Sequence, residues 1–342
     1  MIQLVGDRYP RLFFSDEEKE PFYFKEDVIF PEDPPERPNM EDLHPLSLEE
    51  RKDLFLNIGR RSVKIEGKRN LSDRVIATVR LSEMLGISDI ITPAKKAEFL
   101  YEGESILGIK MPAAKGVAFS GLNELPELNG YRLYYTANAA RQLTILMMFD
   151  FICGQIDRHS KNLKLLTDID FSDIRPVSEG RENIPVKGIV AIDHDLSFGL
   201  NGYDDIKKRV SAGRCISPEI LGKVQYTAID IPFYEKIKEI KEEDFNNKFG
   251  DILSEGEIEA FFDRTNGLIK ILESERESEE KRSQSGEVFF SRFIETDADY
   301  EEYIKHMEDF ANNDKDNHNI RFSYRPSYLK KYILSQRKLG EE

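Results

Sequence analysis

The sequence predicts an α+β protein with two lobes, the first small and rich in strands and the second mainly helical. Three observations lead to this prediction. Residues 54–118 contain short runs of alternating apolar and polar side chains around one helical pattern. Residues 119–275 carry longer apolar patterns with helical spacing. Hydrophobic residues make up 39% of the 342 residues, which is typical of a globular chain with ample core.

The chain before these lobes is predicted to be an irregular arm. Residues 1–53 are rich in charge and proline, as in the run FPEDPPERPNMEDLHP. Within the arm, residues 21–30, PFYFKEDVIF, have the composition of a short strand. We therefore expect the arm to end near residue 53, where the first lobe begins.

The first lobe, residues 54–118, is predicted to consist of one helix with strands on either side of it. Residues 70–86 have helical spacing, with Ser72 as the expected N-cap and Gly86 at the expected end. The strand-like runs of this lobe are 62–67, 95–103 and 105–111.

The second lobe, residues 119–275, is predicted to be built around a strongly apolar helix over residues 138–156. Two short strands, 162–166 (NLKLL) and 188–193 (GIVAID), follow this helix and are expected to pair with each other. Further helical patterns occur at 218–225, 232–240 and 254–274.

The last part of the chain, residues 276–342, is predicted to be a helical extension. A charged run at 275–285 separates it from the second lobe and is typical of a solvated segment. An amphipathic helix is expected at 297–311, followed by a basic, tyrosine-rich tail at 321–338. The tail is expected either to dock on the protein or to bind a partner.

Composition argues against several classes of function. The chain has 49 Lys and Arg against 64 Asp and Glu, for a net charge of -15, which disfavours nucleic acid as the main partner. No apolar run is long enough for a membrane span, and the N-terminus does not resemble a signal peptide. The two cysteines, Cys153 and Cys215, make no disulfide framework, so we expect a reducing, cytoplasmic location.

A polar stretch between two apolar runs is the first candidate site. Residues 151–166 read FICGQIDRHSKNLKLL, and place Asp157, Arg158, His159 and Asn162 between segments that are expected to be buried. One interpretation is a helix C-terminus with a satisfied histidine. The other interpretation is a site that handles phosphate and metal.

Asp193 favours the second interpretation. It ends the strand that is expected to pair with the strand beginning at Asn162, and this pairing would bring Asp157, Asn162 and Asp193 together. Phosphoryl transfer from ATP needs a carboxylate that orients and deprotonates the attacking hydroxyl. It also needs oxygen ligands, such as an amide and a second carboxylate, for Mg²⁺.

The histidines near these residues suggest a metal site of another kind. His159, His194 and Asp193 could bind zinc, but a further ligand at a suitable spacing is missing from the sequence. We therefore expect His194 to be a surface residue at the end of its strand.

The stretch DRHSKN, residues 157–162, resembles the catalytic loop of atypical kinases. This group includes phosphoinositide kinases, HipA-like bacterial kinases and the secreted Golgi kinases that phosphorylate casein. The later motif of the secreted group has an Asp with Phe-Gly five and six residues after it. Asp193 is followed by Phe198 and Gly199 at those spacings. The resemblance covers residues 62–275 and implies a bilobal protein-kinase-like fold.

The resemblance also implies roles for the matched residues. Asp157 would be the catalytic base, while Asn162 and Asp193 would be metal ligands at the nucleotide. Arg158 and His159 would support the loop, with Arg158 paired to an acid. Asp195 lies off the matched positions and is a further candidate for helping to bind metal.

Kinases of this kind need a strand lysine on the ATP phosphates and a helix glutamate that positions the lysine. Lys64 is the candidate lysine, because it lies on an expected strand just before the helix, and Lys68 and Lys25 are alternatives. The helix position at which glutamate is expected is Val75, so the sequence departs from the pattern there.

The sequence therefore predicts an ATP- and magnesium-dependent kinase that acts on a protein Ser/Thr hydroxyl. A lipid kinase is less favoured, because a short basic tail is the one membrane-attracting feature of this acidic chain. Two alternatives stay open. One is a pseudokinase that binds a partner, which Val75 and the lack of a glycine-rich loop before Lys64 support. The other is a kinase-fold enzyme that transfers another group from ATP.

Overall fold

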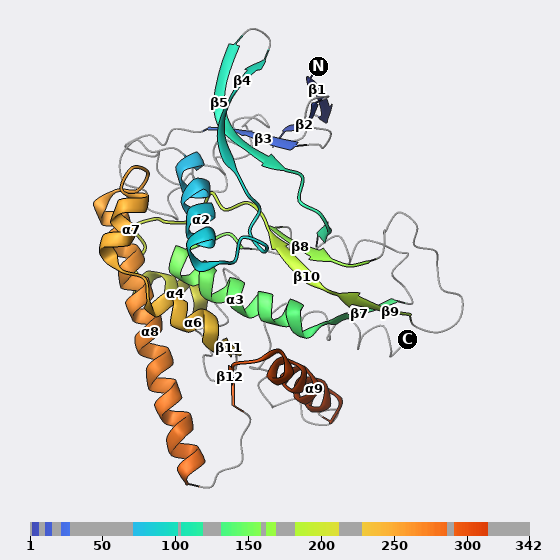
Figure 1. The fold of residues 1–342 in the computed structure, drawn as a ribbon, viewed down its shortest axis with the longest axis vertical. Helices are drawn as coiled ribbons and strands as arrows, with labels where there is room; N and C mark the ends of the chain where they lie inside the picture. The colour runs from blue at the N-terminus through green and yellow to red at the C-terminus, as the bar shows by residue number, and fades with distance from the viewer. Residues whose placement is uncertain are drawn as a thin grey trace, which may run out of the picture.

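The computed structural model shows a protein of mixed helix and sheet, as the sequence predicts (Figure 1). A five-stranded sheet lies at one end of the molecule, and most of the helices gather at the other end around the buried helix α3 (Ala137–Cys153). The structure describes residues 2–6, 11–15, 22–27, 71–101, 104–118, 131–158, 162–168, 182–211, 228–285 and 291–313.

The sheet is antiparallel throughout and has the strand order β1-β2-β3-β5-β4. Phe22 and Phe24 of β3 are buried on one face of the sheet, so Lys25, which follows Phe24, points to the other face. The strands are β1 (Ile2–Gly6), β2 (Arg11–Ser15), β3 (Phe22–Glu26), β4 (Lys95–Tyr101) and β5 (Glu104–Pro112).

Three of these strands come from the segment that was expected to be an arm. Residues 2–6, 11–15 and 22–26 belong to the sheet rather than to an irregular arm, and a boundary at residue 53 would separate strands of one sheet. The proline- and charge-rich run that suggested irregular structure begins only at residue 30. The strands expected at 21–30, 95–103 and 105–111 are confirmed. The strand expected at 62–67 lies outside the described residues.

Helix α2 (Leu71–Leu85) is tied to the end of β3. The Asp27 carboxylate accepts hydrogen bonds from the Ser72 backbone N–H (3.2 Å) and from Ser72 Oγ (2.6 Å). Ser72 therefore lies inside the first turn, and Asp27 takes the capping role that we expected of Ser72. Gly86, with a φ of 69°, ends the helix as predicted.

Helix α3 is the centre of the main hydrophobic core. Thr136 caps its N-terminus, and Gly154, with a φ of 64°, ends it. Strands β8 (Leu163–Leu166) and β10 (Gly188–Ala191) pair antiparallel beside α3, which confirms the pairing that the sequence predicted. Strand β6 (Val117–Ala118) extends this small sheet, and β7 (Tyr131–Tyr135) pairs with β9 (Glu182–Val186).

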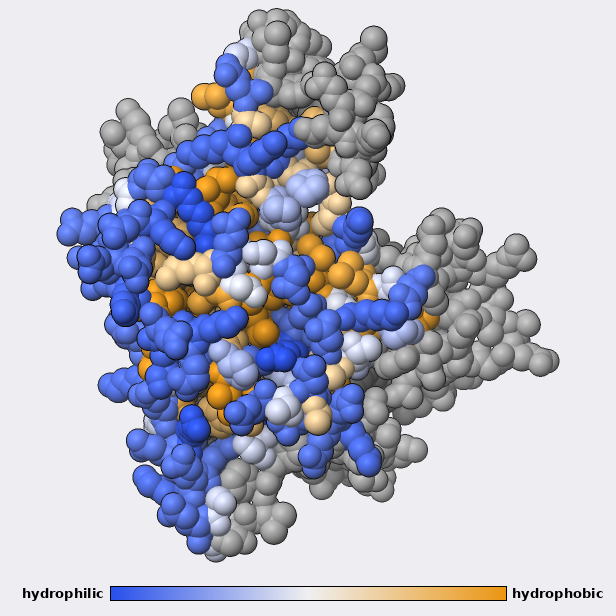
Figure 2. Space-filling view, in the orientation of Figure 1, coloured by the Kyte–Doolittle hydropathy of each residue, from blue (hydrophilic) through white to orange (hydrophobic). Residues whose placement is uncertain are grey.

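The remaining helices confirm two predicted helical patterns, 232–240 and 254–274. Helix α8 continues through the charged run, and its second half extends away from the body of the protein (Figure 1). The surface of this part is mainly hydrophilic (Figure 2). The predicted boundary near residue 275 therefore falls inside a helix. The helices are α4 (Tyr203–Ser211), α6 (Ile231–Lys238), α7 (Glu242–Phe249) and α8 (Glu255–Gln284).

Helix α9 (Asp297–Asn313) confirms the helix expected at 297–311. It packs on α3, and its buried Tyr300 and Tyr303 share a small core with Ala140 of α3. Strands β11 (Ile229–Asp230) and β12 (Phe293–Ile294) pair next to it. The pattern at 218–225 and the basic tail lie outside the described residues.

None of the helices in the described residues combines the length and the apolar character that crossing a bilayer requires.

Candidate active site

The candidate site lies where α3 ends and where two paired strands meet the loops beside them. Gly154 ends α3, and the chain then runs through Asp157 to Asn162, which directly precedes β8. The neighbouring strand, β10, is followed directly by Ile192 and Asp193. The Ile192 backbone N–H donates to Asn162 O (3.1 Å), so the pairing of the strands continues to the edge of the site.

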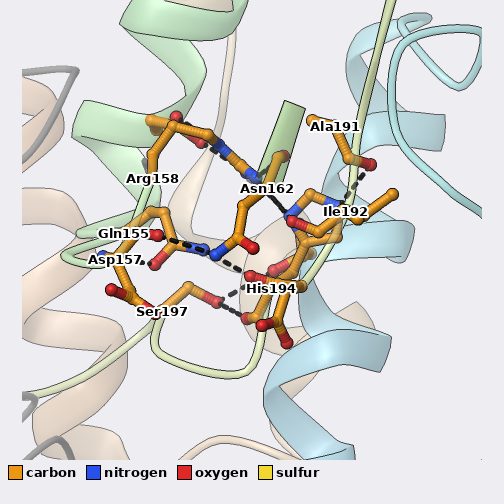
Figure 3. A network of polar contacts seen from close by, with 11 residues as sticks. Gln155, Asp157, Arg158, Asn162, Ala191, Ile192, His194 and Ser197 are labelled. Atoms are coloured by element: carbon orange, nitrogen blue, oxygen red, sulfur yellow. Dashed lines mark hydrogen bonds and ion pairs between the residues drawn. The ribbon is translucent and has the colours of Figure 1, made fainter. Parts of the chain in front are cut away.

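One glutamine side chain joins the two segments of the site (Figure 3). Gln155 Nε2 donates to Asp193 O (3.1 Å), and Gln155 Oε1 accepts from the Asp157 backbone N–H (3.0 Å). Asn162 Nδ2 donates to Asp157 O (2.9 Å). The backbones of Asp157 and Asp193 and the side chain of Asn162 thus belong to one hydrogen-bond network, while the meeting of the three side chains at a metal stays a prediction. Gln155 was not foreseen, and an amide two residues before the candidate base is the signal that could have found it.

Arg158 holds this loop against the rest of the protein. It is buried, and its Nε and Nη2 donate to the two carboxylate oxygens of Asp150 (2.9 and 3.1 Å). Its Nη1 donates to Asn162 O (3.0 Å) and Ile192 O (2.6 Å). The expected pairing of Arg158 with an acid is therefore confirmed. The same side chain fixes both ends of the loop and the strand next to it.

His194 is buried, with 2% of its surface exposed, so the expectation of a surface residue is wrong. Arg158 Nη2 lies 2.9 Å from His194 Nδ1, and His194 Nε2 lies 3.1 Å from Ala191 O. Because an arginine can only donate, Nδ1 accepts and Nε2 carries the proton. Burial and the charge of Arg158 lower the pKa of His194 to about 3, so the ring is neutral.

The zinc interpretation gains no support from this geometry. Both ring nitrogens of His194 are occupied by protein groups. Across the described ranges, no group of three or more His, Cys, Asp or Glu side chains is arranged to hold a metal ion. His159, the other histidine of that interpretation, lies outside those ranges.

Lys25 reaches the site from the five-stranded sheet. Its Nζ lies 2.8 Å from Asp193 Oδ1 and 2.6 Å from Asp195 Oδ2. The side chain of Lys25 is 11% exposed, that of Asp195 is 9% exposed and that of Asp193 is 40% exposed. The lysine and Asp195 are therefore enclosed, while Asp193 keeps a side open to solvent.

The charges of these three groups depend on one another. Burial works against the ammonium of Lys25, but the carboxylates of Asp195 and Asp193 outweigh it and raise its pKa. Burial raises the pKa of Asp195 to about 6, although Lys25 opposes the shift. Burial also acts on Asp193, but there the attraction of Lys25 prevails and lowers its pKa. The charge of Asp157 adds a smaller contribution that also raises the pKa of Asp195.

The backbone after β10 adopts two unusual conformations. Asp193 has a φ of 60° and Phe198 has a φ of 55°, in the left-handed region that side chains disfavour. Phe198 is fully buried and stacks with Phe249 and Phe261. This packing holds the turn that aims Asp193 and Asp195 at Lys25, and strained residues of this kind cluster at functional sites.

Helix α2 borders the site but provides no acid for Lys25. Both hydrogen-bond partners of Lys25 in the described part of the chain belong to the segment after β10. Val75, where a glutamate was expected, is buried. The preceding residue, Arg74, donates to the carbonyls of Ser197 and Phe198 and forms a buried ion pair with Glu257 of α8.

The lysine predicted first, Lys64, lies outside the described residues, as does Lys68. Lys25, the third lysine considered, is the one that the structure brings to the aspartates. The signal for Lys25 was the alternation in PFYFKE, because the buried phenylalanines turn the lysine to the opposite face of its strand.

This arrangement offers an enclosed ammonium in contact with two carboxylates, and Gln155 links it to the segment that carries Asp157 and Asn162. Amide and carboxylate oxygens are the ligands that Mg²⁺ takes, and a lysine ammonium is a donor that phosphate oxygens accept. The residue types present are therefore those that a magnesium-bound nucleotide would need, although the described side chains form no ready-made metal site. The sequence matches no family model, and a search of curated proteins found none that is similar to it.

Proposed function

We propose that this chain is an ATP- and magnesium-dependent phosphotransferase of the atypical kinase type, acting on a protein Ser/Thr hydroxyl. One observation carries the proposal: Lys25 Nζ lies 2.8 Å from Asp193 and 2.6 Å from Asp195, and a single glutamine links Asp193 to Asp157. A strand lysine, a metal-binding aspartate and a catalytic-loop aspartate are the parts that protein kinases combine.

Lys25 is suited to bind the phosphates of ATP because its strand is held on both sides. β3 lies between β2 and β5, so the lysine projects from the interior of a sheet rather than from a loop. A rigid element keeps a charged group in place without further loss of conformational freedom. In this role the ammonium would stabilise the negative charge of the phosphates.

Asn162 and Asp193 would hold the magnesium ion, which neutralises phosphate charge when bound. Asn162 is fixed through its side-chain amide to Asp157 O, and its backbone carbonyl accepts from Arg158 and Ile192. Asp193 has the more exposed carboxylate of the two that contact Lys25, so it remains accessible to a ligand.

Asp157 would orient the acceptor hydroxyl and take its proton. It is partly exposed, and its backbone is fixed by Gln155 and Asn162. Proton transfer by such a group contributes about 10²- to 10⁴-fold to a rate. A protein acceptor is favoured over a lipid, because the chain has a net charge of -15 and a mainly hydrophilic surface on the face shown in Figure 2.

The proposal is tested by incubating the protein with radiolabelled ATP, Mg²⁺ and a mixture of protein acceptors. We expect transfer of label, and we expect Asp157→Asn to lower its rate about 10²- to 10⁴-fold. Asp204→Asn, on α4, is the control that should keep the wild-type rate. Full activity of Asp157→Asn would show that the role given to Asp157 is wrong. Mass spectrometry of the product distinguishes a phosphoryl group from a nucleotide or another group.

A pseudokinase is the second candidate, and one observation favours it. The residues between β1 and β2 read Asp-Arg-Tyr-Pro, whereas protein kinases cover the ATP phosphates with a glycine-rich loop. A pseudokinase would show nucleotide-dependent stabilisation without transfer. Thermal unfolding with ATP, in the presence and absence of Mg²⁺, followed by the transfer assay separates the two candidates.

A further inference from the structure

We propose that Asp195 is the positioning residue for Lys25, in place of the helix glutamate that protein kinases use for this purpose. This inference rests on the function proposed above. Asp195 Oδ2 lies 2.6 Å from Lys25 Nζ, in a contact that is almost closed to solvent. A charge-assisted hydrogen bond in such surroundings fixes an ammonium strongly.

Helix α2 leaves this role open, because its residues near the site are committed elsewhere. Asp73 pairs with Lys96 of β4. Arg74 is a cation like Lys25, so it cannot attract the lysine, and it is paired with Glu257. Val75 is apolar and buried. An acid for Lys25 therefore has to come from another element, and the segment after β10 supplies it.

The two aspartates that contact Lys25 differ in solvent exposure, and this difference suits them to different roles. The side chain of Asp195 is 9% exposed and that of Asp193 is 40% exposed. Ser197 holds the turn around Asp195, since its hydroxyl donates to His194 O (2.7 Å) and contacts Thr78 Oγ1 of α2 (2.9 Å). The enclosed carboxylate suits a permanent contact with Lys25, and the open one suits a ligand that comes and goes.

This division has a measurable consequence for magnesium. Without the charge of Asp195, Lys25 would depend on Asp193 alone, which is also the carboxylate proposed to bind Mg²⁺. An ammonium and a divalent cation on one carboxylate repel each other. More Mg²⁺ would then be needed to bind nucleotide. A role of Asp195 in folding alone would not change the magnesium requirement in this selective way.

The test measures binding of a fluorescent, non-hydrolysable ATP analogue as Mg²⁺ is titrated, with no turnover involved. In Asp195→Asn we expect the Mg²⁺ concentration at half-maximal binding to rise about tenfold, since a charged hydrogen bond is lost. Asp195→Glu keeps the carboxylate, so its Mg²⁺ concentration at half-maximal binding should lie close to that of the wild type. Asp251→Asn, which removes an exposed carboxylate paired with Arg80, is the matched control and should leave the midpoint unchanged.

A second pair of variants tests whether Asp195 acts through the lysine. In a Lys25→Met background the ammonium of the contact is already absent, so adding Asp195→Asn removes the second charge and leaves no buried cation behind. There we expect Asp195→Asn to change the Mg²⁺ midpoint by less than about twofold. A tenfold shift that persists without Lys25, or an unchanged midpoint in Asp195→Asn alone, overturns this inference and leaves the proposed function standing. If the wild type binds the analogue equally with and without Mg²⁺, the proposed function itself is overturned.

Discussion

At the scale of single residues, the site depends on a lysine whose charge is secured by its neighbours. An ammonium buried to the extent of Lys25 would lose its proton more easily in apolar surroundings. Asp193 and Asp195 outweigh this effect, so Lys25 stays charged across the physiological range. With both aspartates ionised, the three side chains carry one positive and two negative charges. A magnesium ion would reverse the sign of this cluster and make it attractive to phosphate.

Replacing Lys25 tests the assignment directly. We expect Lys25→Met to lower the rate of phosphoryl transfer about 10²- to 10³-fold, the usual loss when one group that stabilises developing charge is removed. Lys96→Met is the matched control, because Lys96 lies on the same sheet and makes a partly exposed pair with Asp73. Lys64→Met and Lys68→Met should also keep nearly the full rate.

Steady-state transfer assays, with circular dichroism to verify folding, measure these differences among the four lysine variants. Equal and small losses in all of them would contradict the role of Lys25 and favour the pseudokinase. A large loss of transfer rate in Lys64→Met alone would show that residues 62–67, and not β3, provide the lysine that binds the phosphates.

At the scale of elements, the position of Lys25 depends on how closely β3 approaches β5. Gly108 lies opposite Glu26 in this pair. A Cβ on Gly108 would lie 2.3 Å from Lys25 O and 2.9 Å from the ring of Phe24. Such distances are far inside van der Waals contact, so the backbone of β3 would have to move. The glycine therefore sets the spacing that brings Lys25 to its aspartates.

We expect Gly108→Ala to destabilise the protein by about 1–3 kcal/mol, as overpacking does in a well-packed region. Because β3 shifts, the concentration of ATP at half-maximal rate should also rise. Urea unfolding and steady-state kinetics measure the two effects. Ser105→Ala, on the same strand at an exposed position, should change stability by less than about 0.5 kcal/mol. A Gly108→Ala variant with wild-type stability and kinetics would show that the spacing of β3 and β5 does not matter.

The sequence predicted the elements whose signals are local. The buried helix α3 and the paired strands at 162–166 and 188–193 follow from runs of apolar residues. The contacts between distant segments could not be predicted in the same way. Asp27 caps a helix that begins 44 residues later, and Lys25 meets acids that lie 168 and 170 residues away. No short-range pattern encodes such pairings, because they depend on the order of strands in the sheet.

At the scale of the whole molecule, α2 connects the sheet to the helical part of the protein. Asp27 at the end of β3 caps α2, and Thr78 and Arg74 of α2 contact the segment after β10. Arg74 also forms an ion pair with Glu257 at the start of α8. Both partners are almost completely buried. The lysine and the aspartates of the site are thus held in register by one continuous set of contacts.

The contribution of the Arg74–Glu257 ion pair, which joins α2 to α8, can be measured as a free energy of unfolding. Arg74→Met leaves the Glu257 carboxylate buried without its cation, which we expect to cost about 3–5 kcal/mol of unfolding free energy. Glu257→Gln should be destabilising as well, although the amide can still accept from the Ser254 N–H in the capping box. In the double variant neither charge is left alone, so its loss should be smaller than the sum of the single losses. Urea unfolding of the four proteins measures this coupling.

The matched control is Arg80→Met, because Arg80 also pairs with an acid, Asp251, but at an exposed position. Exposed pairs contribute about 0–1 kcal/mol, so this variant should stay close to the wild type. If Arg74→Met costs no more than Arg80→Met, α2 is not fastened to α8 by this ion pair. If the cost is large and transfer activity falls with it in the folded variant, α2 holds the aspartate segment in its active position, because Arg74 donates to the carbonyls of Ser197 and Phe198 in that segment. That segment begins at Asp193, whose left-handed backbone is stable only while the packing around it persists.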